Sequence, residues 1–145
     1  MQYQHGLLIG PYTAKRVKEE IATLRENLPD EKYTLVNGRD LLSGLPRQIE
    51  LKQSEVREVL KPAFATISNV VLKVLQQTPP ELSSDIIEGG ILVNGGCALI
   101  DGVDEFFQKQ IGLNVYVSKD PLTAIVEGTK VLLKNRGNYF IKPIE

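Results

Sequence analysis

The feature that most constrains this chain is residues 91–99, where the apolar run Ile-Leu-Val ends at Asn-Gly-Gly and a helical pattern follows. Gly95 and Gly96 carry no Cβ, so the backbone there can pass close to a flat ligand. A helix that opens behind such glycines offers free N–H groups and a positive dipole end, which suits a nucleotide at the carboxyl end of a strand. Asn-Gly is also the commonest hairpin turn, so a simple turn stays open as an alternative.

The pattern of apolar residues predicts a long helix in the middle of the chain. Ser54 is expected to cap it, and it is expected to reach about Gln77. Pro62 should kink it or mark a restart, because proline removes a backbone donor. Three- and four-residue spacing predicts a broad buried stripe on this helix, formed by Val56, Leu60, Phe64, Ile67, Val71, Val74 and Leu75.

Strands and helices alternate after the long helix. The pattern predicts a short helix over 81–87, a strand over 91–94, a helix that ends near Gly112, a strand over 114–117 and a last helix. Asp120 is expected to cap the last helix, with Pro121 at its first position. The apolar face of that helix would be Leu122, Ile125, Val126, Leu132 and Leu133, and the tail from residue 135 onward is expected to be loose. This order is typical of helices packed on a partly parallel sheet, but a sheet of two strands needs more strands or a covering partner.

The first fifty residues predict a small α+β lobe. Thr13 is expected to cap a helix that continues from residue 14 to about residue 26. Strands are expected over 33–36 and 47–51, with a turn at 37–40.

Length and composition fit one ordinary domain or two small lobes. The 145 residues are 42% hydrophobic and 24% charged, as in soluble globular chains, and the formal net charge of −1 gives no basis for nucleic-acid binding. No apolar run approaches the ~20 residues that span a bilayer, and the N-terminus has no secretory pattern. A single cysteine, Cys97, fits a reducing compartment, so we expect a cytoplasmic protein. His5, the sole histidine, is expected to be an unremarkable surface residue, and no metal site is predicted.

An ordered set of motifs resembles the C-terminal half of MreB, Mbl and their close relatives, the bacterial actin-like cell-shape proteins. The matching segments are residues 7–10 with Thr13, Ala14 and Lys18, then residues 38–41, 44–46, 78–82, 85–86, 93–99 and 119–123. The resemblance implies an α/β chain with the second half only of the actin-like, ribonuclease H-like ATPase fold. Residues 1–53 would form a small upper lobe like subdomain IIB, and residues 54–145 an incomplete lower α/β lobe like subdomain IIA.

The family is known as ATPases that polymerise into membrane-associated filaments and guide elongation of the cell wall. The resemblance therefore implies ATP, with Mg, as the ligand, held in a cleft between two halves. The family's first phosphate loop and catalytic glutamate belong to the other half, and this sequence contains no Asp-x-Gly-rich phosphate hairpin. We expect no catalytic residue here, and no turnover by this chain alone, because phosphoryl transfer depends on positioning and charge neutralisation.

The resemblance also implies partners and a location. The expected partners are further copies of the chain or a full-length MreB-like protein in filaments, and a separately encoded first half. We expect the chain in the cytoplasm, with membrane contact only indirect, through partner filaments. No nucleic-acid partner is expected.

Three segments would surround the adenosine by this resemblance. The candidate cofactor-binding residues are Lys15, Lys18, Glu19 and Ala22 on the first helix, Gly95, Gly96 and Cys97 after the strand, and Asp120 before the last helix. Lys15 is usually acidic in the family, and Asn94 and Cys97 replace a threonine and a third glycine. Simpler interpretations stand beside these roles: a solvated Lys/Glu helix face, a buried small hydrophobe at Cys97, and an N-cap at Asp120.

Two other functions stay open. The chain could be a non-catalytic interaction module that pairs with, or caps, filaments of a full-length actin-like protein. It could also belong to another branch of the actin, sugar-kinase and chaperone superfamily, or to plasmid-segregation or magnetosome filament proteins. Residues 78–82 and 119–123 favour the cell-shape branch.

Overall fold

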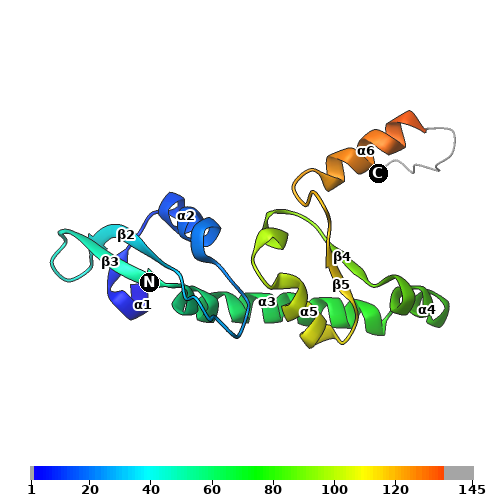
Figure 1. Cartoon of the computed structure of the whole chain (residues 1–145), viewed down its shortest axis with the longest axis horizontal. Coiled ribbons are helices and arrows are strands. Elements are labelled where there is room, and N and C mark those ends of the chain that lie inside the picture. The colour runs from blue at the N-terminus through cyan, green and yellow to red at the C-terminus, as the bar shows by residue number, and fades with distance from the viewer. Residues whose placement is uncertain (1, 136–145) are drawn as a thin grey trace.

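Helix α3 (Gln53–Gln76) runs along the base of an elongated molecule, from the end of β3 to the start of α4 (Figure 1). The computed structural model describes residues 2–135. We call residues 2–52 the upper lobe and residues 53–135 the lower lobe. Whether they fold as separate units, as the predicted boundary near residue 53 implies, stays a prediction.

The upper lobe is a three-stranded antiparallel sheet with two helices. Its elements are α1 (Gln2–His5), β1 (Leu7–Leu8), α2 (Pro11–Ile21), β2 (Tyr33–Asp40) and β3 (Pro46–Lys52). The strand order is β1-β2-β3, with Leu7 opposite Asp40 and Val36 opposite Ile49. Apolar side chains of the strands meet one face of α2 in a small core of Leu7, Val17, Ile21, Val36 and Leu51.

The lower lobe is built on a parallel pair of strands. Its elements after α3 are α4 (Pro80–Gly89), β4 (Ile91–Val93), the 3-10 turn η1 (Gly96–Leu99), α5 (Val103–Ile111), β5 (Val115–Val117) and α6 (Ala124–Lys134). Ile91 of β4 lies opposite Val115 of β5. Its core is Leu24, Phe64, Ile100, Val103, Phe107 and Val115. The mixed helices and sheets agree with the predicted α/β class, and the helix ending at Gly112 is confirmed.

Helix α2 differs from its prediction at both ends. It begins at Pro11 after an extended Gly10, because proline is well tolerated at the first helical position, so Thr13 is not its cap. It ends at Ile21 rather than near residue 26, since Ala22 is extended and Thr23 pairs with Asp101 as an isolated parallel bridge. A tertiary contact therefore ends the helix.

The predicted turn at 37–40 is wrong, because β2 continues to Asp40. Gly38 lies on β2 beside the end of β1, which pairs with β2 in antiparallel register. A Cβ at Gly38 would stand 2.5 Å from the carbonyl oxygen of Leu8. The glycine permits close strand contact, and the hairpin turn falls at 41–45, where Gly44 has a φ of +72°.

The long helix α3 is confirmed, and it ends within a residue of its predicted end. Its N-cap is Lys52 and Ser54 lies inside the helix, so the predicted cap at Ser54 is wrong. The helix continues through Pro62, so the predicted restart is also wrong. Its N-terminus is held by the backbone N–H of Lys52, which donates to Glu55 Oε2 at 2.9 Å. The predicted buried stripe is confirmed only in part. Phe64 is buried, and Leu60 and Val56 are half-buried and pack against the two cores. Ile67 and Val74 are instead 46% and 60% exposed. The reason is that the described lobes cover the helix over only part of its surface.

The last helix begins at Ala124, three residues after Pro121, its predicted first position. Asp120 acts through its backbone instead of its side chain, since its carbonyl oxygen accepts from the N–H groups of Thr123 and Ala124. No residue of α6 is buried among those the structure describes, and Figure 1 shows the helix standing away from the lower lobe. The predicted loose tail lies almost wholly outside the described residues.

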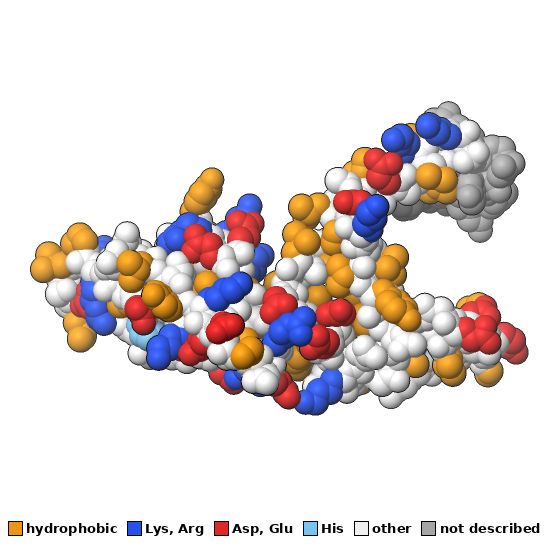
Figure 2. Space-filling view, viewed as in Figure 1, with side chains coloured by type: hydrophobic (Ala, Val, Ile, Leu, Met, Phe, Trp, Pro, Cys, Tyr) orange, Lys and Arg blue, Asp and Glu red, His pale blue; other side chains and the backbone are white. Residues whose placement is uncertain are grey.

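Hydrophobic side chains gather on the surface over β4, β5 and the turn that leads to α6 (Figure 2). Leu92 and Tyr116, neighbours on the two strands, are 61% and 51% exposed. None of the described helices combines the length and apolar character needed to cross a membrane.

Candidate functional site

The parallel pairing of β4 and β5 brings the segments that follow both strands to one edge of the sheet. The Gly95 N–H donates to the carbonyl oxygen of Pro121 at 2.8 Å, and the Ser118 N–H donates to that of Val93 at 3.1 Å. Two of the three predicted segments, Gly95–Gly96 and the turn containing Asp120, therefore lie together. Pro121 was not predicted as a site residue, and its position next to Asp120 was the only signal for it.

The backbone at the glycine pair is open. Gly95 has a φ of +90°, which favours glycine, and no heavy atom lies within 4 Å of the place a Cβ would take. A Cβ at Gly96 would meet only Leu122 Cδ2, at 3.8 Å. A flat ligand could therefore approach this backbone without displacing side chains.

The predicted helix directly behind the glycines is wrong. The segment after Gly95 is the single 3-10 turn η1, and the next α-helix begins only at Val103. Because η1 has four residues, it offers no long helix dipole to a phosphate group. What remains at this edge is an exposed glycine backbone.

The four candidate residues associated with α2 do not share one surface. Lys15 and Glu19 form an exposed pair, with Lys15 Nζ 3.7 Å from Glu19 Oε1, as expected of a solvated helix face. Lys18 is half-buried and lines a groove between α2 and α3 with Val56. Ala22, just past the helix, packs against the core of the lower lobe. Their role toward a ligand stays a prediction.

Cys97 is exposed, so its interpretation as a buried small hydrophobe is wrong. It lies at the rim of an apolar groove of about 340 Å³ between α3 and β4. Phe64, Ile67 and Val93 also line this groove, which is a different surface from the groove beside Lys18.

The segment after α2 connects the upper lobe to the residues that follow η1. The hydroxyl of Thr23, which is fully buried, donates to Asp101 Oδ2 at 3.0 Å, and Arg25 Nε donates to Asp101 Oδ1 at 2.8 Å. Burial raises the pKa of Asp101, but the hydrogen bonds from Arg25 and Thr23 outweigh it, so the pKa lies below its usual value. None of these residues was predicted, because no local pattern links positions 78 residues apart.

His5 is not the unremarkable surface residue that was predicted. Its Nε2 lies 2.7 Å from Glu55 Oε1, and the side chain is about three-quarters buried. Within residues 2–135, no three His, Cys, Asp or Glu side chains gather closely enough to hold a metal ion.

Solved structures match this fold closely. A crystal structure of MreB5 of Spiroplasma citri bound to AMPPNP aligns with a TM-score of 0.89 and 36% identity, over 94% of this chain and 41% of that one. A second, of MreB5 bound to ADP, aligns with a TM-score of 0.88 and 37% identity, over 93% of this chain and 41% of that one. These matches define the class: an α/β chain with part of the actin-like fold, as predicted.

The sequence comparisons name the family. The family model for MreB/Mbl protein matches residues 1–140. The cell shape-determining protein Mbl of Bacillus subtilis (strain 168) is 39% identical over 132 residues, 91% of this chain and 39% of Mbl. The cell shape-determining protein MreB of Escherichia coli (strain K12) is 39% identical over 125 residues, 86% of this chain and 35% of MreB. The chain belongs to the MreB/Mbl family and spans about two-fifths of the length of these relatives.

Proposed function

We propose that this chain supplies one wall of the ATP-binding cleft of a cell-shape protein of the MreB type, on the side of the adenosine. The observation that carries the proposal is the hydrogen bond from the Gly95 N–H to Pro121 O, which joins the glycine pair and the Asp120 turn at the carboxyl edge of a parallel sheet. That edge is where open α/β sheets bind ligands. The nucleotides bound to the MreB5 structures support the same ligand class.

ATP binding would use the open glycine backbone for the adenosine. The phosphates and Mg²⁺ need groups from another source, because neither the sequence nor the described side chains offer a phosphate hairpin or an acidic cluster. We therefore expect this chain by itself to bind nucleotide weakly and to hydrolyse none. Phosphate release above background by the purified chain would contradict this.

The binding test is a titration with a fluorescent ATP analogue, comparing the natural chain with Gly96→Val. The structure leaves room for the Cβ, so the variant should fold normally and bind the analogue more weakly, because the side chain stands where the ligand would lie. Gly89→Ala, in α4 and equally uncrowded, is the matched control. Equal affinity in all three proteins would overturn the assignment of this edge.

A second function, an interaction module for filaments, rests on a different observation. The apolar side chains Leu92, Tyr116 and Ile125 are exposed on the lower lobe, where a larger assembly would cover them. In this role the chain pairs with, or caps, filaments of a full-length relative in the cytoplasm and reaches the membrane only through them. Co-sedimentation with polymerised MreB tests it, and a chain that stays in the supernatant excludes it.

A further inference from the structure

The segment between α2 and β2 belongs to the upper lobe by sequence but is bound to the lower lobe. The backbone of Leu24 donates to the carbonyl oxygen of Asp101 at 2.8 Å, beside the parallel bridge between Thr23 and Asp101. The Leu24 side chain is buried in the lower-lobe core next to Phe64. The segment is thus docked on the lower lobe through one isolated bridge and one buried side chain.

Side chains of α5 hold the same segment from one side. Arg25 Nη1 donates to Glu105 Oε1 at 2.6 Å, and Lys109 Nζ donates to Glu26 Oε2 at 2.8 Å. The bond from Lys109 lowers the pKa of Glu26. Each pair is half-exposed and contributes little alone, but together with the buried Thr23 they form a connected set.

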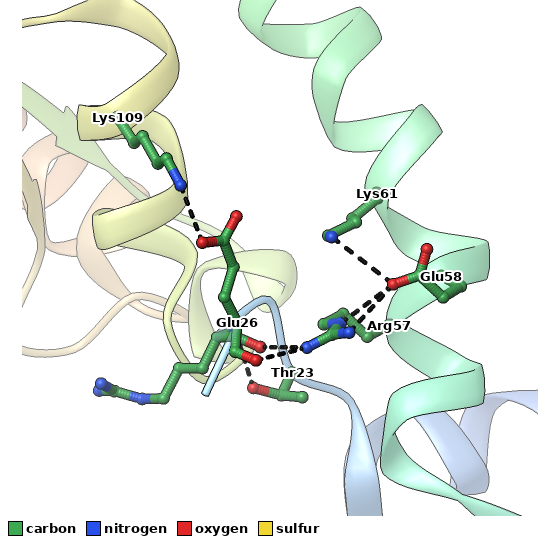
Figure 3. A network of polar contacts seen from close by, with 7 residues as sticks. Thr23, Glu26, Arg57, Glu58, Lys61 and Lys109 are labelled. Atoms are coloured by element: carbon green, nitrogen blue, oxygen red, sulfur yellow. Dashed lines mark hydrogen bonds and ion pairs between the residues drawn. The ribbon is translucent and has the colours of Figure 1, made fainter. Parts of the chain in front are cut away.

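Helix α3 holds the segment from the other side. Arg57 Nη1 donates to the carbonyl oxygens of Arg25 and Glu26, at 3.1 and 2.8 Å. Figure 3 shows Arg57 reaching from α3 toward the docked segment that carries Glu26, while Glu58 lies between Arg57 and Lys61.

The two hydrophobic cores of the described chain share no buried residue. The side chains that cross between the lobes are Ala22 and Leu24 of this segment, in the lower core, and Val56 of α3, which packs on the upper core. Apart from α3, the strongest connection between the lobes is this docked segment. Gly102 shows how closely it fits: a Cβ there would stand 2.6 Å from Arg25 Cγ.

We propose that Thr23, Arg25 and Asp101 are positioning residues that fix the orientation of the upper lobe, and with it α2, relative to the Gly95–Gly96 edge. We call the contacts of Thr23 and Arg25 with Asp101 the clamp. Asp101 follows the glycine pair after residues 97–100, and Thr23 follows α2 after Ala22. The clamp therefore connects the end of α2 to the segment that carries the glycine pair. The consequence for nucleotide rests on the proposed function; the orientation itself does not.

The experiment measures the distance between the lobes by double electron–electron resonance. Spin labels are placed on cysteines introduced at Leu42, in the exposed hairpin turn, and at Ser84, on α4, in a Cys97→Ser background. The intact chain should give one narrow distance distribution. Thr23→Val keeps the side-chain shape but removes the hydroxyl, and Arg25→Ala removes both ion pairs; each should broaden the distribution.

Matched controls separate positioning from general damage. Thr23→Ser restores a hydroxyl and should restore the narrow distribution. Arg16→Ala removes an arginine whose side-chain hydrogen bonds go to Glu20 and the Leu35 carbonyl oxygen, within the upper lobe, and should leave the distribution unchanged. Circular dichroism checks that each variant is folded. Unchanged narrow distributions in folded Thr23→Val and Arg25→Ala would overturn the proposal.

The nucleotide readout distinguishes this proposal from the proposed function. If the competent orientation falls to about a third of the population, the dissociation constant of the fluorescent ATP analogue rises about threefold. Broadened distances with unchanged affinity would overturn the link to the cleft. Absence of nucleotide binding by the natural chain would remove the proposed function, while the distances would still decide whether the clamp fixes the lobes.

Discussion

The two lobes differ in how fully their sheets are covered by helices. The upper lobe has an antiparallel sheet, which can keep one face in water, and α2 covers the other face over Val17 and Ile21. The lower lobe has a parallel pair, and such strands are ordinarily buried on both faces. Here α3 and α5 cover one face, while Leu92 and Tyr116 are exposed on the pair.

The comparison teaches that the lower lobe depends on a few large side chains. Phe64, Phe106 and Phe107 pack edge-on or tilted, with ring centroids 5.7 to 6.3 Å apart. In the upper lobe the small core is supported by a continuous ladder of strand pairs from Tyr33–Lys52 to Arg39–Pro46. One lobe relies on aromatic packing and the other on backbone pairing.

The largest expected effect is on the aromatic cluster. Phe64→Ala should lower the free energy of unfolding by about 3–5 kcal/mol, because it leaves a cavity between α3 and α5. Urea unfolding followed by circular dichroism measures it. Ile67→Ala, one turn along α3 and 46% exposed, is the control and should cost much less. Equal losses in both variants would show that the aromatic cluster is not what holds the lower lobe.

Backbone pairing in the upper lobe is tested by Gly38→Ala. The added Cβ would stand 2.5 Å from the Leu8 oxygen, so β1 must move, at a cost of about 1–3 kcal/mol. Urea unfolding reports the cost, and Gly89→Ala, which meets nothing within 4 Å, is the control. A variant as stable as the natural chain would mean that β1 adapts freely.

A smaller effect is expected on the uncovered sheet face. Leu92→Thr should change the free energy of unfolding by less than about 0.5 kcal/mol, because the side chain is already exposed. The same change should reduce self-association measured by light scattering, since it removes apolar surface. Val93→Thr, on the half-buried side, should instead cost stability. A large stability loss in Leu92→Thr would mean that this face is covered.

The smallest expected effect is on stability at acidic pH, and it comes from Asp40 at the hairpin turn of the upper lobe. The Ser43 backbone N–H, then Arg47 and the Ser43 hydroxyl, hold the pKa of Asp40 well below its usual range. A lowered pKa in the folded state means that the stabilisation is present above about pH 4 and is lost as the pH falls further.

Asp40→Asn should therefore flatten the decline in melting temperature between about pH 4 and pH 2. Asp30→Asn, at another exposed position, is the control and should leave the decline unchanged. Identical pH profiles in Asp40→Asn and the natural chain would show that the turn contributes nothing.

Local pattern predicted the long helices and β3 but not the contacts between distant residues. Apolar spacing predicted α3 and placed its end within a residue, and the residues around Gly112 placed the end of α5. Asn37-Gly38 has the composition of a turn, yet both residues lie in β2. The Leu8 carbonyl oxygen approaches Gly38 so closely that a side chain there would collide with it. Asp120 has the composition of an N-cap, but the helix begins four residues later.

The candidate site was predicted in the same uneven way. The glycine pair was predicted from its position after a strand and the Asp120 turn from the family resemblance, and parallel pairing of β4 and β5 brings them together. The clamp through Thr23 and Asp101 could not be predicted, because it joins segments on opposite sides of the long helix in sequence. Exposure of Cys97 depends on which neighbours cover it, which spacing does not specify.

Pro62 interrupts the backbone hydrogen bonding of α3 near the middle of the helix. Lacking an N–H, it leaves the carbonyl of Glu58 without its helical partner, on the turn that lies beside the docked segment at Arg57. Helix α3 therefore lacks one backbone hydrogen bond near its middle, close to the contacts of Arg57 with the docked segment. If one lobe rotates relative to the other, α3 should bend at this turn, and the contacts of Arg57 with the docked segment should oppose that bending.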